Sequence, residues 1–330
     1  MTWQALYERA LASEDAAAGY YNRNVGVPTP EGRVNVRIPL AAADVMDVRL
    51  WREEDVLACI GPYVQHAPAL RHVSHEPRFQ VHHFIDGPVL DGFRPRGSAV
   101  PAHVMTDVVT LMDQLARIPA EKTPVLPPEW PASGDSAGFG RLLAGLTRRI
   151  HAAHLGEYGE VFAAFGVPAE PLAAVDPLWD GLTSRPFAVL HADLHRKNMI
   201  VSDGSTWFLD WELALWGDPV YEIAIHFHKM DYPDAQREEV LRLWRERLPA
   251  PSTAGPGTDL DLYAAHERVK SAVVDTIRYS KQLAAASPQQ REFLIGRLAK
   301  KLNAARRVWG SPPDMTPERV AAALAPWLER

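Results

Sequence analysis

The residues best suited to chemistry in this sequence lie together in one short stretch. A run of four apolar residues, typical of a buried strand, is followed at once by the polar segment His191–Asn198. Two further apolar runs flank the turn Asp203-Gly204, and this arrangement predicts a β-hairpin whose second strand ends at Asp210. Because a hairpin brings the chain back to its starting point, the side chains of Asp193, Asn198 and Asp210 are predicted to converge.

Three converging oxygen donors suit phosphoryl transfer to a hydroxyl. One carboxylate orients the attacking hydroxyl and accepts its proton, and two more oxygen ligands hold Mg²⁺. The spacing Asp-x-x-x-x-Asn followed by a second, metal-binding Asp is described for protein kinases, so these residues match an established pattern. A plain buried strand pair with polar turn residues would leave the convergence unexplained.

A transition-metal site is the rival chemical interpretation of the same segment. His191, Asp193 and His195 alternate along the chain and could share one face of a strand, and histidine and carboxylate ligands suit zinc or iron. No further His or Cys pair has a confirming spacing, however. This interpretation also gives Asn198 and Asp210 no role.

Three motifs in this region carry a resemblance to a known family. They are His191-x-Asp193-x-x-x-x-Asn198, Leu209-Asp210-Trp211-Glu212 and Gly217-Asp218-Pro219-x-x-Glu222-Ile223-Ala224. Together they resemble the aminoglycoside phosphotransferase superfamily, whose members include choline, homoserine and methylthioribose kinases. The resemblance implies an α+β, two-lobed, protein-kinase-like fold. Residues 1–87 would then form a small, β-rich nucleotide-binding N-lobe, and residues 88–330 a larger, mostly helical catalytic and substrate-binding C-lobe.

The resemblance also assigns a role to each polar residue of the motifs. Asp193 would be the catalytic aspartate, and Asn198 and Asp210 would be the Mg²⁺ ligands. His191 resembles the structural histidine that braces the catalytic loop, and Asp218 resembles the acid that supports this loop from below. The implied cofactors are Mg²⁺ and a phosphoryl donor, ATP or GTP.

The N-lobe should supply a cation for the nucleotide phosphates and an acid that holds this cation. Residues 33–38 alternate strictly between polar and apolar types, which predicts a strand with one buried face. By resemblance, Arg37 takes the position usually filled by a phosphate-binding lysine, although a planar guanidinium does not simply replace a point charge. Glu53 resembles the acid paired with it, with its neighbour Glu54 as the alternative.

Two further nucleotide contacts are expected from the same lobe. The phosphate-covering loop should lie near residues 19–24, where Asn22 and Asn24 would serve in place of a glycine-rich sequence. The strand predicted over residues 79–85 resembles the segment joining the lobes. There the backbone groups of His83 and Ile85 would meet the nucleotide base.

Three acids are candidates for the substrate side of the site: Glu212, Asp231 and Asp275. Clustered carboxylates would suit an amine-bearing substrate. The resemblance favours a hydroxylated, antibiotic-like natural product of aminoglycoside, peptide or nucleoside type as the phosphoryl acceptor. The alternatives are a primary-metabolite kinase of the same superfamily and a non-catalytic nucleotide-binding protein.

The elements that must position these residues follow from apolar periodicity and turn signals. Strands dominate before the turn Asp86-Gly87-Pro88 and helices after it, which makes this turn the candidate domain boundary. Helices are predicted over residues 3–16, 48–60, 102–118, 139–154, 157–166, 238–247, 260–283, 289–308 and 317–329.

The bulk composition limits the partners. The 330 residues carry a net charge of −6, which argues against nucleic acid as the main partner because backbone binding needs a concentrated basic surface; it is compatible with a cationic substrate. No apolar stretch approaches the roughly 18 to 20 residues that span a bilayer, so no membrane partner is expected. A single cysteine, Cys59, and an N-terminus without a secretory pattern are expected of a cytoplasmic protein.

Overall fold

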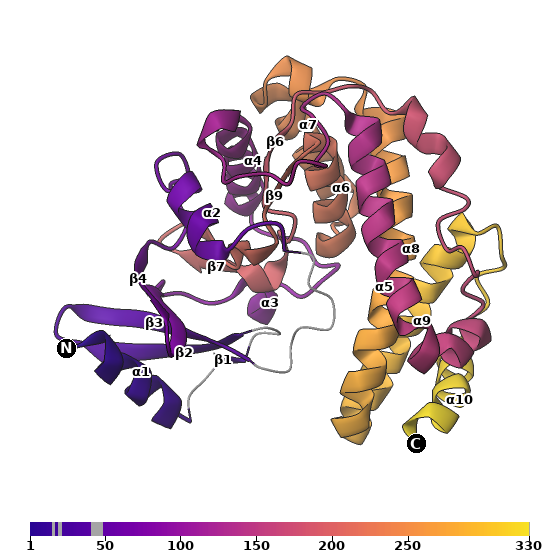
Figure 1. The fold of residues 1–330 in the computed structure, drawn as a ribbon, viewed down its shortest axis with the longest axis horizontal. Coiled ribbons are helices and arrows are strands. Elements are labelled where there is room, and N and C mark those ends of the chain that lie inside the picture. Colours follow the sequence, from indigo (N-terminus) through magenta and orange to yellow (C-terminus); the bar gives the residue numbers. More distant parts are fainter. Residues whose placement is uncertain (15–16, 19–21, 41–48, 330) are drawn as a thin grey trace. The chain divides into compact units, whose positions relative to one another are not determined.

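The computed structural model describes residues 1–14, 17–18, 22–40 and 49–329 (Figure 1). Its α-helices are α1 (Trp3–Ala12), α2 (Glu53–Ile60), α3 (Leu90–Phe93), α4 (Ala102–Ala116), α5 (Ser136–Phe165), α6 (Pro219–Met230), α7 (Asp234–Arg247), α8 (Pro256–Ala285), α9 (Pro288–Val308) and α10 (Pro317–Leu328). Its strands are β1 (Ala17–Ala18), β2 (Asn22–Thr29), β3 (Gly32–Pro39), β4 (Leu70–His75), β5 (Arg78–His83), β6 (Ala188–Leu190), β7 (Met199–Ser202), β8 (Ser205–Phe208) and β9 (Leu215–Gly217).

Contacts within the chain define two compact units. The first comprises residues 1–127, 187–222 and 229–253, and the second comprises residues 128–186, 223–228 and 254–330. Among the described residues, every strand lies in the first unit, as do the loops that carry Asp193, Asn198 and Asp210. The division of the chain near residue 87 stays a prediction.

An antiparallel sheet with the order β1-β2-β3-β5-β4 forms the N-terminal part of the first unit. The predicted alternation of residues 33–38 is confirmed, since Val34, Val36 and Ile38 pack into one apolar cluster. Helix α1 contributes Leu6 and Ala10 to this cluster. The cluster fixes which face of β3 is buried, so Arg37 must project from the opposite face.

The predicted hairpin is confirmed as β7 and β8, which pair antiparallel from Met199–Phe208 to Ser202–Ser205. Its turn residues, Asp203 and Gly204, both have positive φ angles, of 48° and 76°, as the tight hairpin turn favoured by Asp-Gly requires. Strand β6 pairs separately with β9. The loop after β6 and the end of β8 therefore come from two short, independently paired ribbons.

Glycine is required where the chain leaves the sheet and meets the hairpin. Gly87 has a φ angle of 146°, and a Cβ atom there would lie 2.4 Å from the Val201 carbonyl oxygen. The next residues continue this contact, because the Val201 N–H donates to the Pro88 carbonyl oxygen at 3.0 Å. The segment after residue 87 thus lies against the hairpin that carries the chemistry.

The helices differ from prediction mainly at two points, of which the first is α6 (Pro219–Met230), a helix absent from the predicted ranges. Residues 139–154 and 157–166 were predicted as two helices, but α5 runs unbroken from Ser136 to Phe165. A glycine inside a helix, such as Gly156, destabilises it by only about 1 kcal/mol relative to alanine. Packing of the buried side chains of Phe139, Tyr158 and Phe162 along α5 offsets this loss. Figure 1 shows α5 and α8 as long neighbouring helices within the second unit.

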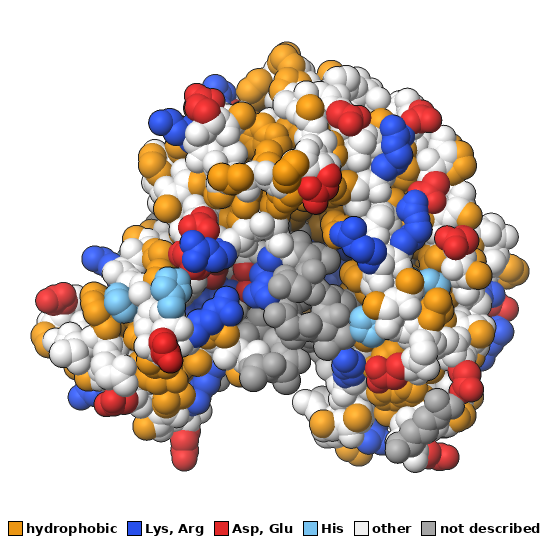
Figure 2. Space-filling view, viewed as in Figure 1, with side chains coloured by type: hydrophobic (Ala, Val, Ile, Leu, Met, Phe, Trp, Pro, Cys, Tyr) orange, Lys and Arg blue, Asp and Glu red, His pale blue; other side chains and the backbone are white. Residues whose placement is uncertain are grey.

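A feature of the helices and a feature of the surface concern the expectations for membrane and nucleic-acid partners. No helix among the described residues has the length and hydropathy that crossing a bilayer requires. Acidic and basic side chains are interspersed over the face of the molecule drawn in Figure 2.

Candidate active site

The catalytic loop predicted from sequence begins directly after β6. Ala192 takes a left-handed backbone conformation, with a φ angle of 57°, and turns the chain sharply before Asp193. The loop ends in a short 3-10 turn that contains Asn198. The Asn198 side-chain amide donates to the Asp193 backbone carbonyl at 3.1 Å and to its Oδ2 atom at 3.0 Å. These bonds hold the two polar side chains together.

A buried histidine ties this loop to the end of the hairpin. His191 Nε2 donates to the Leu209 carbonyl oxygen at 3.1 Å, and His191 Nδ1 accepts from the Asp193 N–H at 3.3 Å. Burial lowers the pKa of His191 to about 4, so the ring is neutral and can donate from one nitrogen while it accepts at the other. Because the Leu209 N–H also donates to the Asn198 carbonyl oxygen at 2.9 Å, Asp210 is held next to the catalytic loop.

Arg37 is the centre of a buried cluster of charges on the other side of the site. Its guanidinium contacts Glu53 Oε1 at 2.8 Å, Glu212 Oε2 at 3.4 Å and also Asp210 Oδ1. Glu53 accepts in addition from the Trp211 N–H at 3.1 Å. Glu54, the sequence alternative, instead accepts from the Gln80 side chain at 2.9 Å. The structure therefore brings Glu53 to Arg37.

Acids outnumber bases around Arg37. Burial would lower the pKa of Arg37, but the carboxylates of Glu53, Asp210 and Glu212 outweigh it and raise this pKa. Burial raises the pKa of Glu53, and burial together with the Asp210 charge raises that of Glu212 to about 7. Arg49 adds only a weak further attraction to Glu212. A cluster in which three carboxylates share one buried guanidinium has the charge and the oxygen donors to accept a divalent cation.

The residues present fit Mg²⁺ rather than a transition metal. Mg²⁺ in such sites uses one or two carboxylates and completes its shell with phosphate oxygens and water, and Asp210 and Asn198 offer the protein oxygens. In the described part of the chain, no group of three or more His, Cys, Asp or Glu side chains could hold a metal by itself. Both ring nitrogens of His191 are already bonded to backbone groups, so the zinc interpretation finds no support.

Asp193 has basic neighbours that the sequence did not reveal. Lys229, near the end of α6, donates from Nζ to Asp193 Oδ1, and His195 Nε2 lies 3.5 Å from Oδ2. Burial would raise the pKa of Asp193, but the Lys229 charge and the His195 hydrogen bond hold it well below its usual range. The carboxylate is therefore ionised, as a group that orients an attacking hydroxyl must be.

The family of the chain follows from a comparison with known sequences. The profile of the phosphotransferase enzyme family matches residues 14–255. The chain belongs to this family. A search of curated proteins found no match.

Solved structures agree on the fold of this phosphotransferase. The choline kinase LicA from Streptococcus pneumoniae has a TM-score of 0.60 at 12% identity, covering 92% of this chain and 98% of that one. The macrolide 2'-phosphotransferase MphH from Brachybacterium faecium has a TM-score of 0.56 at 17% identity, covering 94% and 98%. An APH(4)-Ia aminoglycoside phosphotransferase in complex with AMP-PNP and hygromycin B has a TM-score of 0.57 at 16% identity, covering 92% and 96%. The predicted α+β, protein-kinase-like fold is confirmed.

A glutamate of the phosphotransferase supports the catalytic loop from inside. Glu222 Oε2 accepts from the Ala192 N–H at 2.9 Å, directly beneath Asp193. Burial raises the pKa of Glu222 to about 7. Asp218, predicted to play this supporting part, is fully buried and accepts from the Val220 N–H at 2.9 Å at the start of α6. Its role beneath the loop stays a prediction.

The other predicted nucleotide contacts are distributed along the sheet. Asn22 donates to Glu212 Oε2 at 3.2 Å, beside Arg37, whereas Asn24 accepts from the Asn35 side chain at 3.2 Å. Residues 19–21 of the predicted phosphate loop lie outside the described residues. The His83 N–H donates to the Ala69 carbonyl oxygen at 2.8 Å, so this amide is committed to the sheet. The Ile85 side chain is buried.

Each of the three acids predicted for the substrate side has a basic partner. Glu212 contacts Arg37. Asp231 lies 3.6 Å from Arg96 Nε and is largely exposed. Asp275, in the second unit, is buried against Lys301 Nζ. Their assignment to the substrate stays a prediction.

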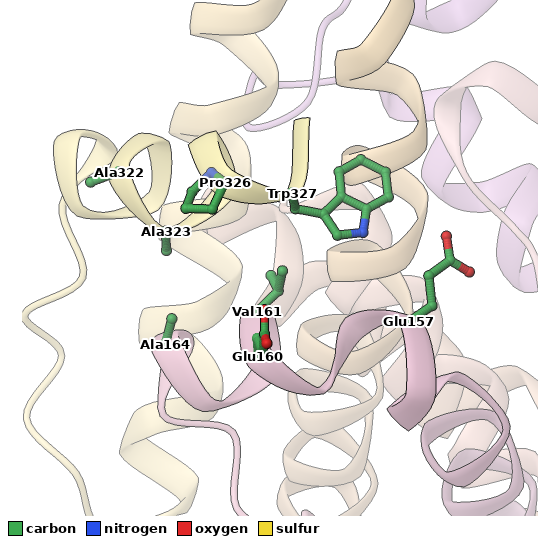
Figure 3. Close-up of a pocket in the computed structure, with 8 residues that line it drawn as sticks. All are labelled: Glu157, Glu160, Val161, Ala164, Ala322, Ala323, Pro326 and Trp327. Atoms are coloured by element: carbon green, nitrogen blue, oxygen red, sulfur yellow. The ribbon is translucent and has the colours of Figure 1, made fainter. Parts of the chain in front are cut away.

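A groove in the second unit lies away from this chemistry. It is about 210 Å³ in volume and lies in the second unit, between α5 and α10 (Figure 3). Its walls include Glu157, Val161 and Trp327. No residue of the three motifs lines it, so it is not the active site.

Proposed function

We propose that this phosphotransferase is a small-molecule kinase that transfers the γ-phosphoryl group of ATP or GTP to a hydroxyl with the help of Mg²⁺. The observation that carries the proposal is the hydrogen bond of 3.0 Å from the Asn198 side-chain amide to Asp193 Oδ2. Asp210 lies beside this pair, because the residue before it, Leu209, is hydrogen-bonded to His191 and Asn198. Asp193 would be the catalytic residue, and Asn198 and Asp210 would hold the metal. The AMP-PNP complex of the similar APH(4)-Ia enzyme supports a nucleoside triphosphate as donor.

Each protein group has a definite task in this reaction. Asn198 and Asp210 would hold Mg²⁺, which would supply positive charge to offset the charge that develops on the phosphates. Arg37, held by Glu53, would bind phosphate oxygens as a fixed guanidinium. Asn22 and Asn24 would cover the phosphates, and backbone groups of His83 and Ile85, other than the His83 N–H that is bonded to Ala69, would meet the base. The acceptor hydroxyl would bind to the Asp193 carboxylate in line with the γ-phosphorus.

The acceptor class is proposed to be an antibiotic-like natural product of aminoglycoside, peptide or nucleoside type, inactivated by O-phosphorylation in the cytoplasm. Macrolide and hygromycin B enzymes among the similar structures support it. The choline kinase LicA supports the second candidate, a primary-metabolite kinase. A non-catalytic nucleotide-binding protein is the third, and the complete set of Asp193, Asn198 and Asp210 weighs against it.

A screen of nucleotide consumption tests the proposal. The purified chain is given ATP or GTP with Mg²⁺ and a panel of hydroxyl compounds in three groups: anionic, neutral and cationic. We expect consumption with at least one compound and none with the Asp193→Asn variant. Resistance of an expressing host to an antibiotic would favour the first candidate, and rescue of an auxotroph the second. Nucleotide binding without turnover of any compound would favour the non-catalytic alternative.

A further inference from the structure

We propose that the acceptor carries an anionic group, a carboxylate or a phosphate, next to its reacting hydroxyl, and that Lys229 is the residue that binds this group. The inference rests on the proposed function and narrows its substrate class, because it excludes acceptors of the aminoglycoside type, which carry amines and no carboxylate or phosphate. It comes from the way the two oxygen atoms of the Asp193 carboxylate are occupied.

The two carboxylate oxygens of Asp193 face different partners. Oδ2 accepts from the Asn198 amide at 3.0 Å and lies 3.5 Å from His195 Nε2. Oδ1 is contacted by the Lys229 ammonium. Asn198 is a proposed metal ligand, so Oδ2 belongs to the nucleotide side of the carboxylate. The acceptor hydroxyl must therefore reach Oδ1, where Lys229 now lies.

The transfer step requires that Lys229 give way. The acceptor oxygen forms a new bond to the γ-phosphorus, the bond from that phosphorus to the bridging oxygen breaks, and the nucleoside diphosphate leaves with the electron pair. The hydroxyl proton passes to Asp193 Oδ1 and from there to solvent. An ammonium in contact with Oδ1 competes with the hydroxyl for that oxygen and weakens the carboxylate as a proton acceptor.

An anionic group on the acceptor resolves this competition. The anionic group would replace Asp193 Oδ1 as the ionic partner of the Lys229 ammonium. The Asp193 carboxylate would then be available to the acceptor hydroxyl. An acceptor with an ammonium group at the same place would instead bring two like charges together. The same lysine thus serves as a specificity-determining residue.

The remaining charges of the site point in the same direction. His195 Nδ1 accepts from the Lys197 N–H at 3.2 Å, so its proton lies on Nε2 and faces Asp193 as a second donor. Meanwhile Glu212 and Asp231 already have the arginine partners Arg37 and Arg96. A cationic acceptor would find no carboxylate among these that lacks a basic partner.

The three-group acceptor panel provides the test. We expect the compounds that are phosphorylated to fall in the anionic group, and conversion of the best one into its neutral amide or ester to lower kcat/KM at least tenfold. Phosphorylation confined to neutral or cationic compounds would overturn the inference and leave the kinase assignment intact. Failure to bind Mg²⁺-nucleotide in calorimetry, with no turnover in any group, would overturn both.

Variants of Lys229 locate the preference in this side chain. Lys229→Gln should raise KM for the anionic acceptor at least tenfold with little change in KM for Mg²⁺-ATP, and Lys229→Arg should restore most of the difference. Lys229→Glu should shift the preference towards amine-bearing compounds. Lys122→Glu makes the same charge change at an exposed position and should behave as the wild type. A preference unchanged in both Lys229→Gln and Lys229→Glu would refute the role of this lysine.

Discussion

Asp193 and Asp210 lie at the ends of two neighbouring loops, and their surroundings are opposite in charge balance. Around Asp193, donors outnumber acids, since Lys229, His195 and Asn198 all approach one carboxylate. Around Asp210, acids outnumber bases, since it shares the guanidinium of Arg37 with two glutamates. The same residue type thus has two opposite electrostatic surroundings, which suit the two different tasks proposed for it.

The difference indicates which side of the site meets which ligand. A carboxylate surrounded by donors stays ionised and is suited to orient a hydroxyl. A carboxylate in an acid-rich cluster attracts a divalent cation. Removing the charge at each position should therefore harm different steps.

The largest effect is expected at Asp193. Asp193→Asn keeps the shape of the side chain but removes its charge, so turnover should fall by about a thousandfold, while Mg²⁺-nucleotide binding changes little. Asp210→Asn should instead weaken Mg²⁺-nucleotide binding. Steady-state kinetics and calorimetry on both variants measure this contrast. Equal losses of nucleotide affinity in the two variants would show that the two sides are not distinct.

A smaller effect, on stability, is expected at Arg37. Arg37→Met leaves Glu53, Asp210 and Glu212 buried together without their shared base, so the free energy of unfolding should fall by roughly 3 kcal/mol. Arg33→Met, which removes from the same strand an exposed pair with Asp86 and a contact with the Phe84 ring, should cost about 1 kcal/mol or less. Urea denaturation compares the two. If the free energy of unfolding fell no further in Arg37→Met than in Arg33→Met, the buried carboxylates would not depend on the Arg37 guanidinium for their stability.

A pH dependence should arise beneath the catalytic loop. Burial raises the pKa of Glu222 from 4.5 to about 7, with Lys229 lowering it and Asp193 raising it. The folded protein therefore keeps a proton there that the unfolded chain releases, and stability falls as pH rises from about 4.5 to 7. Glu222→Gln keeps an acceptor for the Ala192 N–H but does not titrate. Between pH 5 and 7.5 the wild type should lose about 2 kcal/mol more stability than this variant; parallel curves would contradict the assignment.

The smallest effect is expected at the sharp turn before Asp193. Ala192 has a φ angle of 57°, which costs an L-residue about 1 to 2 kcal/mol. Ala192→Gly should therefore raise the free energy of unfolding by roughly 0.5 kcal/mol, after the greater freedom of glycine in the unfolded chain is subtracted. Ala188→Gly, within β6, should destabilise instead. The melting temperatures of the two variants test this prediction. If both variants were less stable than the wild type, the backbone at Ala192 would not be strained.

The sequence was sufficient where the signals are local. The Asp203-Gly204 turn fixed the hairpin, and the alternation in residues 33–38 fixed the face from which Arg37 projects. The prediction of two helices over residues 139–154 and 157–166 was wrong, since α5 is continuous and its buried residues pack along its whole length.

Lys229 was missed for a different reason. It lies 36 residues after Asp193 along the chain, and no local pattern marks a contact of that kind. The available signal was its place on the helix, since Glu222 and Lys229 are two turns apart and share a face of α6. Glu222 belongs to the motif that begins at Gly217, so a helix continued from this motif would place Lys229 on the same face as Glu222.

The arginine at position 37 has a consequence for handling the protein. Its guanidinium contacts Glu53 and Asp210 and so is a counterion, present without any metal, for the acid proposed to bind magnesium, Asp210. We therefore expect folding not to depend on metal, in contrast to small domains that unfold when a chelator removes their ion. The chain should keep its melting temperature in EDTA, and metal can be added only when turnover is wanted.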